Sequence, residues 1–269
     1  MVGPSFQSKI GLFAICPHYK PTKNKDRYLK EMSKKHDELK KKSLELILDE
    51  ELLPSEMIIK EGVARVPEVR ISARYKAGIY NKSNKDIMNG SIDILTLSEN
   101  SNNSVVIGII EVKTTKRNDG IIERYNIEQV RDYSTFLAGF LSTDFQRSGE
   151  TQLYGSWDII EFSLKFSSEE STQEFYRTTK SKKSFSIKPF VVLTVLGKRN
   201  NEIIQNIIVK IKEFSIEVDN QEKKAKILLE TNNLLDSYKR HSEYYLLSYE
   251  CKNCSLIKSD TGSRCPIFS

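Results

Sequence analysis

A nearly uninterrupted apolar run, Val105–Ile110, most constrains how this chain folds, because the charged motif Glu111-Val112-Lys113 follows it at once. A run of this length and composition predicts a buried central strand. Side chains alternate along a strand, so Glu111 and Lys113 should share one face of it. Asp93, eighteen residues before Glu111, lies in a second apolar strand. Charges at the ends of buried strands are costly without partners, so we expect these groups to cluster in an α/β protein.

The two carboxylates indicate a divalent cation. Asp93 and Glu111 offer hard oxygen ligands, which magnesium and manganese prefer. A cation of this kind supplies a nucleophilic water, neutralises charge on a phosphate and assists the leaving oxygen. Lys113 would orient the attacking water, stabilise the developing negative charge or act as a base, and the sequence leaves these roles open. The pattern therefore predicts hydrolysis of phosphodiesters.

Three residues outside these strands fit the same chemistry. Gln129 and Tyr133 are four apart in a helix predicted over residues 121–142, so they share a face and could bind phosphate oxygens or orient Lys113. His36 lies on the apolar stripe of a helix predicted over residues 25–53 and should point inward. Its imidazole would be a third metal ligand and would favour manganese as well as magnesium.

The four cysteines form a second candidate site. Cys16 stands alone near the start, whereas Cys251, Cys254 and Cys265 crowd into the last part of the chain. Four thiolates can hold either zinc or an iron–sulfur cluster. One remote cysteine with a terminal trio favours the cluster over two local zinc knuckles. Residues 16 and 241–269 would then form a subdomain that joins the two ends of the chain.

Composition limits the classes of binding partner and the cellular compartment that we expect. The net charge of +6 favours a polyanionic partner, but the excess is mild and does not by itself identify nucleic acid. No segment approaches the ~20 apolar residues of a membrane helix, and the start of the chain is a poor secretory leader. We therefore expect a cytoplasmic protein with no membrane partner and with reduced cysteines.

Periodicity predicts the order of the elements. The sequence indicates a hairpin over residues 57–76, a second hairpin that joins the Asp93 and Glu111 strands through Ser98–Ser104, and a strand at 189–197. A polar helix is expected near 220–240, and 202–214 reads as either strand or helix. Residues 146–186 are rich in Ser, Thr, Lys and Glu, which predicts a mobile insertion with one extra strand at 160–166.

Across residues 16 to 266 the chain resembles the Cas-four nucleases of CRISPR systems, which are RecB-like members of the PD-(D/E)xK superfamily. The ordered residues that carry the resemblance are Cys16, His36, Asp93, Glu111-Val112-Lys113, Gln129-x-x-x-Tyr133, Cys251, Cys254 and Cys265-Pro266. The resemblance implies a single RecB-like nuclease domain over 1–269, with a central mixed sheet flanked by helices. It also implies a 4Fe–4S cluster on the four cysteines.

The resemblance further implies an activity and its partners. The enzyme would be a manganese- or magnesium-dependent deoxyribonuclease on single-stranded DNA, often a 5′-to-3′ exonuclease, in CRISPR spacer acquisition and antiviral defence or in a viral relative. It would work with the CRISPR integrase complex, and a homo-oligomer is compatible with it. The metal would be held by His36, Asp93, Glu111 and the main-chain carbonyl of Val112. Two alternatives stay open: a nucleic-acid-binding module on a nuclease scaffold, and a zinc-stapled restriction-type endonuclease acting on duplex DNA.

Overall fold

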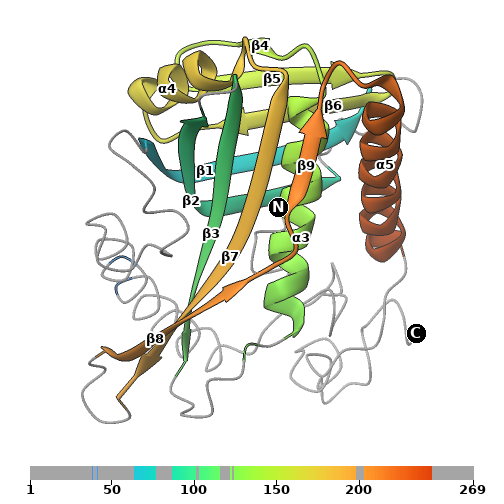
Figure 1. Ribbon diagram of the computed structural model, residues 1–269. Coiled ribbons are helices and arrows are strands. Elements are labelled where there is room, and N and C mark those ends of the chain that lie inside the picture. Colours follow the sequence, from blue (N-terminus) through green and yellow to red (C-terminus); the bar gives the residue numbers. More distant parts are fainter. Residues whose placement is uncertain are drawn as a thin grey trace, which may run out of the picture.

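The computed structural model describes residues 64–76, 87–100, 103–115, 124–197 and 203–243, together with residues 38, 41 and 122. These form an α/β fold in which a nine-stranded mixed sheet is combined with helices α3, α4 and α5 (Figure 1). The elements follow one another as β1 (Ala64–Tyr75), β2 (Met88–Asn100), β3 (Ser104–Thr115), α3 (Arg124–Leu141), β4 (Gln146–Arg147), β5 (Gln152–Trp157), β6 (Ile160–Lys165), α4 (Glu169–Thr179), β7 (Ser184–Leu196), β8 (Ile203–Lys210), β9 (Phe214–Glu217) and α5 (Gln221–Glu243).

The strands lie in the order β4-β5-β6-β1-β2-β3-β7-β8, and β9 also pairs with β7. Strands β3 and β7 run parallel over their whole length, whereas the other neighbouring pairs are antiparallel. A parallel pair needs a long crossover, and here it contains α3, β4, β5, β6 and α4. The sheet is therefore built from two antiparallel groups, β4-β5-β6-β1-β2-β3 and β7 with β8 and β9, which are joined by the parallel pair β3–β7.

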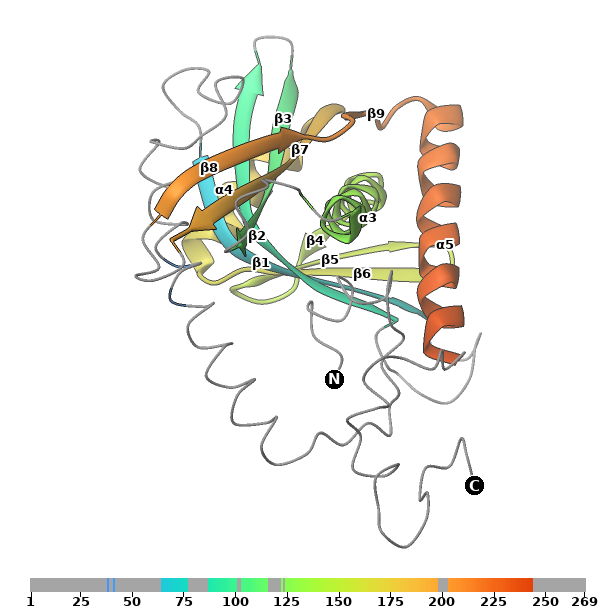
Figure 2. The same cartoon turned by 90° about the horizontal axis from the view of Figure 1, so that it is seen from below.

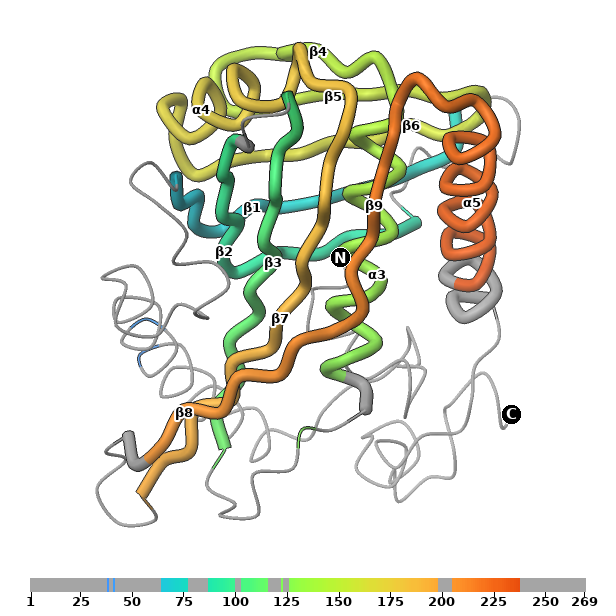
Figure 3. Tube along the Cα trace, in the orientation of Figure 1, coloured from blue at the N-terminus to red at the C-terminus, as the bar shows by residue number. Residues whose placement is uncertain are grey.

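Strands β2 and β3 separate partway along their length. Their pairing ends at Ile94 opposite Ile110, yet β3 continues to Thr115 beside β7. The first part of β2 stays paired with β1 alone, and its trace crosses behind β3 (Figure 3). We call this point of separation, next to Ile94 and Ile110, the fork.

Strand β1 bends at the same level. The pairs Pro67–Ile94 and Val69–Ile92 place Glu68 opposite Asp93, but no ladder pair forms there. Glu68 has a φ of 51°, a left-handed conformation that costs a non-glycine residue about 1–2 kcal/mol. The buried positions of β1 change from Val66 before this residue to Val69 after it. At this residue β1 turns, and the positions whose side chains face the core change from even-numbered to odd-numbered residues.

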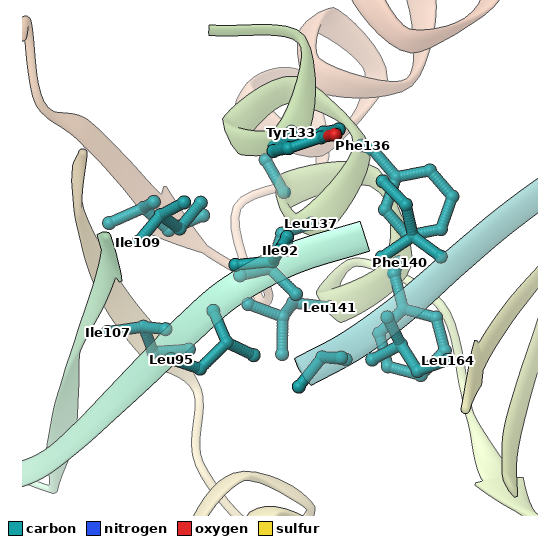
Figure 4. Close-up of a cluster of buried hydrophobic side chains, with 14 of the residues drawn as sticks. Ile92, Leu95, Ile107, Ile109, Tyr133, Phe136, Leu137, Phe140, Leu141 and Leu164 are labelled. Carbon is teal, nitrogen blue, oxygen red and sulfur yellow. The ribbon is translucent and has the colours of Figure 1, made fainter. Parts of the chain in front are cut away.

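Helix α3 lies inside the bend of the sheet, with α5 beyond it (Figure 2). Its apolar residues recur every three or four positions and form one inward stripe. Each of these large side chains contributes about 1.5–3 kcal/mol when fully buried. They meet strand residues from both sides of the fork in one core (Figure 4), which includes Ile92, Leu95, Ile107, Ile109, Tyr133, Phe136, Leu137, Phe140, Leu141 and Leu164.

Most of the predicted elements are confirmed within this part of the chain. The hairpin through Ser98–Ser104 is β2–β3, the helix predicted over 121–142 is α3, and the polar helix near 220–240 is α5. The strand expected at 189–197 begins earlier, as β7, and the undecided segment 202–214 contains β8. The helix predicted over 25–53, apart from residues 38 and 41, and the first part of the predicted hairpin lie outside the described residues.

The prediction of a mobile insertion over residues 146–186 is wrong. This segment forms β4, β5, β6 and α4, and β6 pairs with β1 in the main sheet. Its polar composition conceals an alternation in which Leu153, Phe162 and Leu164 are buried in the common core. The extra strand expected at 160–166 is confirmed as β6. Among the helices that the structure describes, none combines the length and apolar character needed to cross a membrane.

Candidate functional site

The fork brings Asp93 and Glu111 together. Continuing the β2–β3 register by one step beyond Ile94–Ile110 places these two residues opposite each other, and each is only 2% exposed. The backbone N–H of Val112 donates to Asp93 Oδ2 at 2.8 Å. Because the strands have separated here, a side-chain oxygen takes the place that a backbone carbonyl would hold in a continued ladder. This hydrogen bond anchors the Asp93 carboxylate against β3.

Lys113 and Gln129 surround the Glu111 carboxylate. Lys113 Nζ lies 2.6 Å from Glu111 Oε1 and donates to Gln129 Oε1 at 3.0 Å. Gln129 Nε2 donates to the same Glu111 oxygen at 3.1 Å. A lysine ammonium can only donate, so this contact fixes which end of the Gln129 amide faces it. The Lys113 side chain remains 20% exposed, so its charge lies at the boundary between the buried network and solvent.

Tyr133 is joined to this network through Gln129. Gln129 Nε2 donates to its hydroxyl at 2.8 Å, and the ring is completely buried. Burial, with the nearby Glu111 and Asp93 charges, raises the pKa of Tyr133 well above its usual value of 10, so the hydroxyl stays neutral. Of the two predicted roles, the geometry is therefore compatible with orienting Gln129 and Lys113, and a buried hydroxyl has no access to a phosphate.

Gly90 makes room for that ring. A Cβ at this position would lie 2.7 Å from Tyr133 Cε1, closer than carbon atoms pack. The glycine is required here by close approach, not by a left-handed turn. The sequence did offer a signal, since a glycine inside a strand often marks such an approach.

The predicted residues divide into two sets. Asp93, Glu111, Val112, Lys113, Gln129 and Tyr133 are brought together at the fork and the first turns of α3. His36 lies outside the described residues, as do Cys16, Cys251, Cys254 and Cys265, so the cluster and the third metal ligand stay predictions. Within the described ranges, no three His, Cys, Asp or Glu side chains gather as a metal site, because Asp93 and Glu111 are two carboxylates only.

Glu68 was missed by sequence reasoning. It occupies the β1 position opposite Asp93, so Glu68, Asp93 and Glu111 mark one row across three strands. Its side chain is exposed and its backbone is left-handed. Pro67 within a strand-like run was the available signal, because proline in a sheet often marks an irregularity.

The donor set fits a hard divalent cation. Two buried carboxylates supply anionic oxygens, which suit magnesium or manganese better than softer metals. With a cation held between the two carboxylates and Lys113 beside it, one phosphate could contact both the cation and the ammonium. Such an arrangement can hold a cation and stabilise charge that develops on a phosphoryl oxygen.

Comparisons with known proteins do not assign the chain to a family. No protein-family model matches it, and no curated protein matches it. A solved structure titled "Crystal structure of SSO0001" is similar over 71% of this chain at 15% identity, with a TM-score of 0.25. The aligned region spans little more than half of that protein, 56% of its chain. A similarity at this level establishes neither a shared fold nor a shared function.

Proposed function

We propose that the chain is a divalent-metal-dependent deoxyribonuclease with the PD-(D/E)xK arrangement, in which β1, β2, β3, α3 and β7 form the nuclease core. The observation that carries the proposal is the convergence of Asp93, Glu111 and Lys113 at the fork. Gln129 links Glu111 with Lys113, and the Val112 N–H holds Asp93. These groups come from three separate elements, β2, β3 and α3, and the sequence alone predicts each of them as a site residue. Burying two carboxylates beside each other costs free energy, so packing alone does not explain why Asp93 and Glu111 are each only 2% exposed.

Asp93 and Glu111 would hold manganese or magnesium, with His36 and the Val112 carbonyl as the further ligands that the resemblance implies. When bound, the cation lowers the pKa of a water and polarises the phosphate. Lys113, whose side chain is 20% exposed, can stabilise negative charge on a phosphate that enters the site. Gln129 fixes the direction of Lys113, and Tyr133 fixes Gln129.

The resemblance extends the proposal to substrate and cofactor. It suggests single-stranded DNA, cleavage from the 5′ end, and a role with the integrase complex in CRISPR spacer acquisition. It also suggests a 4Fe–4S cluster on Cys16, Cys251, Cys254 and Cys265. Metal and sulfide analysis after anaerobic purification tests the cluster, with zinc as the contrary result.

Digestion of end-labelled DNA with added manganese tests the activity. Single-stranded and double-stranded forms of one sequence, labelled at either end, should show metal-dependent shortening and reveal its direction. An Asp93→Asn protein is the control, because it removes the charge but keeps a side-chain oxygen for the Val112 N–H. If the intact protein binds DNA yet leaves it uncut with manganese or magnesium, a binding module replaces the nuclease as the better account.

A further inference from the structure

Asn126, in the first turn of α3, is a buried polar residue that the hydrogen bonds at the fork do not include. Its side chain is only 5% exposed, and it forms no hydrogen bond with any residue in the described ranges. A buried amide without a hydrogen bond destabilises a folded protein, because the amide loses water and gains no partner. Stability therefore gives no reason for an asparagine at this position.

The amide of Asn126 nevertheless reaches solvent. Within the part of the chain that the structure describes, the fully enclosed side-chain nitrogen and oxygen atoms that lack a hydrogen bond do not include those of Asn126. Since its Oδ1 and Nδ2 have no partner there either, both atoms keep some contact with water. The small exposed fraction of this residue therefore belongs at least in part to its amide, which an oxygen atom from solvent can contact.

Two contacts fix the direction in which α3 runs. Near its start, Gln129 forms hydrogen bonds with Glu111 and Lys113 in the second half of β3. At its end, Leu141 lines the same cavity as Phe185, whose strand β7 begins beside the start of β3. Helix α3 is therefore antiparallel to β3, and its first turn lies toward the end of that strand (Figure 1). Exposure along β3 increases in the same direction, from Glu111, which is buried, to Lys113, which is partly exposed.

Asn126 shares one face of α3 with Gln129, Val130 and Tyr133, which follow it by three, four and seven residues. The exposed fraction rises toward the start of the helix, from 0% at Tyr133 to 3% at Gln129 and 5% at Asn126. The Cβ atoms of residues three apart in a helix are about 5–6 Å from each other. The Asn126 side chain therefore continues the row of Tyr133 and Gln129 out of the core, on the side where Lys113 reaches solvent.

The first turn of α3 also favours an anion. The first backbone N–H groups of a helix have no partner within it, and the helix dipole makes this end positive. The first turn contains no acidic side chain. Glu128, two residues after Asn126, lies on another face of the helix and has its own partner. Because Glu123 precedes this turn in the sequence, we base the inference on hydrogen-bond donors and not on net charge.

We propose that the first turn of α3 binds the DNA phosphate next to the one that is cleaved, with Asn126 Nδ2 as the hydrogen-bond donor. This inference rests on the proposed function and adds where the neighbouring phosphate lies. The cation and Lys113 would hold the cleaved phosphate, and Asn126 lies one helical turn further out than Gln129. A hydrogen bond to a charged phosphate oxygen is stronger than one between neutral groups. Such a contact positions a strand without reading its bases.

Binding of a fluorescein-labelled oligothymidine to the intact protein, without added divalent metal, tests the inference. Asn126→Ala should weaken binding about tenfold, because it removes a hydrogen bond to a charged group. Asparagine carries no charge, so the slope of log affinity against log salt should stay that of the unmodified protein. Asn126→Asp keeps the shape but replaces the donor with a negative oxygen, and it should weaken binding further. Asn233→Ala changes an exposed asparagine of α5 and is the matched control.

Three further readouts separate a phosphate contact from other roles of Asn126. The melting temperature of Asn126→Ala should be unchanged or raised, because the amide has no partner in the described ranges to lose. The loss of affinity should be the same for oligothymidine and oligodeoxyadenosine. In a series of oligothymidines that each carry one neutral methylphosphonate, one position should weaken binding to the unmodified protein and have no further effect on Asn126→Ala.

The outcomes distinguish this inference from the nuclease proposal. If Asn126→Ala binds like the Asn233→Ala control while the unmodified protein cuts DNA with manganese, the phosphate contact is wrong and the nuclease stands. If the unmodified protein neither binds nor cuts DNA, both are wrong. A lowered melting temperature in Asn126→Ala would show a structural role, and a loss of affinity for one base alone would show base reading. Either result would overturn the inference.

Discussion

Two regions of the sheet place charged residues on neighbouring strands and treat them in opposite ways. At the fork, Asp93 and Glu111 are buried and held by hydrogen bonds from Val112, Lys113 and Gln129. Away from the fork, Arg70 on β1 and Lys165 on β6 pair across a regular ladder, and both side chains stay exposed. The difference shows what strand separation achieves: it frees a backbone N–H and makes space in which carboxylates can be buried with partners.

The largest expected effect comes from removing the charge at the edge of the fork. Lys113→Ala should reduce DNA cleavage by about 10²- to 10³-fold, because a positioned group that stabilises transition-state charge is worth that much. Binding of DNA should be largely kept, because several phosphate contacts share the affinity and the substitution removes only one charge. Single-turnover cleavage and anisotropy measure the two separately. Lys212→Ala, an exposed lysine far from Glu111 in the sequence, is the control, and equal cleavage by both variants would defeat the assignment.

Gly90→Ala should disturb both stability and cleavage. The new methyl group would lie 2.7 Å from Tyr133 Cε1 and would displace the ring that supports Gln129. Overpacking of this kind costs about 1–3 kcal/mol in the free energy of unfolding. Gly149→Ala is a contrasting control: its φ of +89° makes alanine unfavourable, but no atom lies within 4 Å of the new Cβ. That variant should lose stability and keep its cleavage rate, and a similar loss of cleavage in both would contradict the role of Tyr133.

Asp93→Ala isolates the anchoring hydrogen bond at the fork. It removes the acceptor of the Val112 N–H and should lower the free energy of unfolding by about 1–3 kcal/mol relative to Asp93→Asn. Both substitutions remove the same charge, so their difference reports the lost acceptor of the Val112 N–H together with the smaller volume of alanine. Chemical denaturation of the two variants is the measurement. Equal stability would mean that the separated strands do not depend on this contact.

The smallest effect concerns Tyr154 on β5. Burial and the hydrogen bond with the Glu161 carboxylate raise its pKa to about 12. Because this folded-state pKa lies above the unfolded value near 10, the contribution to stability is present below pH 10 and is lost as the pH rises toward 12. Ultraviolet titration of the protein against Tyr154→Phe should show this phenol ionising late, and Glu161→Gln should bring it back toward 10. Ionisation of Tyr154 near pH 10 in the unmodified protein would remove the case that Glu161 is engaged locally.

The contrast between the regions also explains what the sequence could predict. The apolar run before Glu111 and the spacing of Gln129 and Tyr133 are local patterns. They predicted β3, α3 and most of the residues that meet at the fork. The left-handed Glu68 is a compromise between long-range pairings, and no local rule requires it. Likewise, the pairing of Arg70 with Lys165 joins segments far apart in the chain, so this pair of like charges becomes visible only in the folded sheet.

Isothermal titration of manganese into the intact protein at neutral pH tests the central claim most directly. The account predicts saturable binding that is lost when Asp93→Asn and Glu111→Gln are combined, while Arg70→Gln/Lys165→Gln leaves it unchanged. Absence of manganese and magnesium uptake by the folded, unmodified protein would contradict the claim that the fork is a metal-dependent catalytic site.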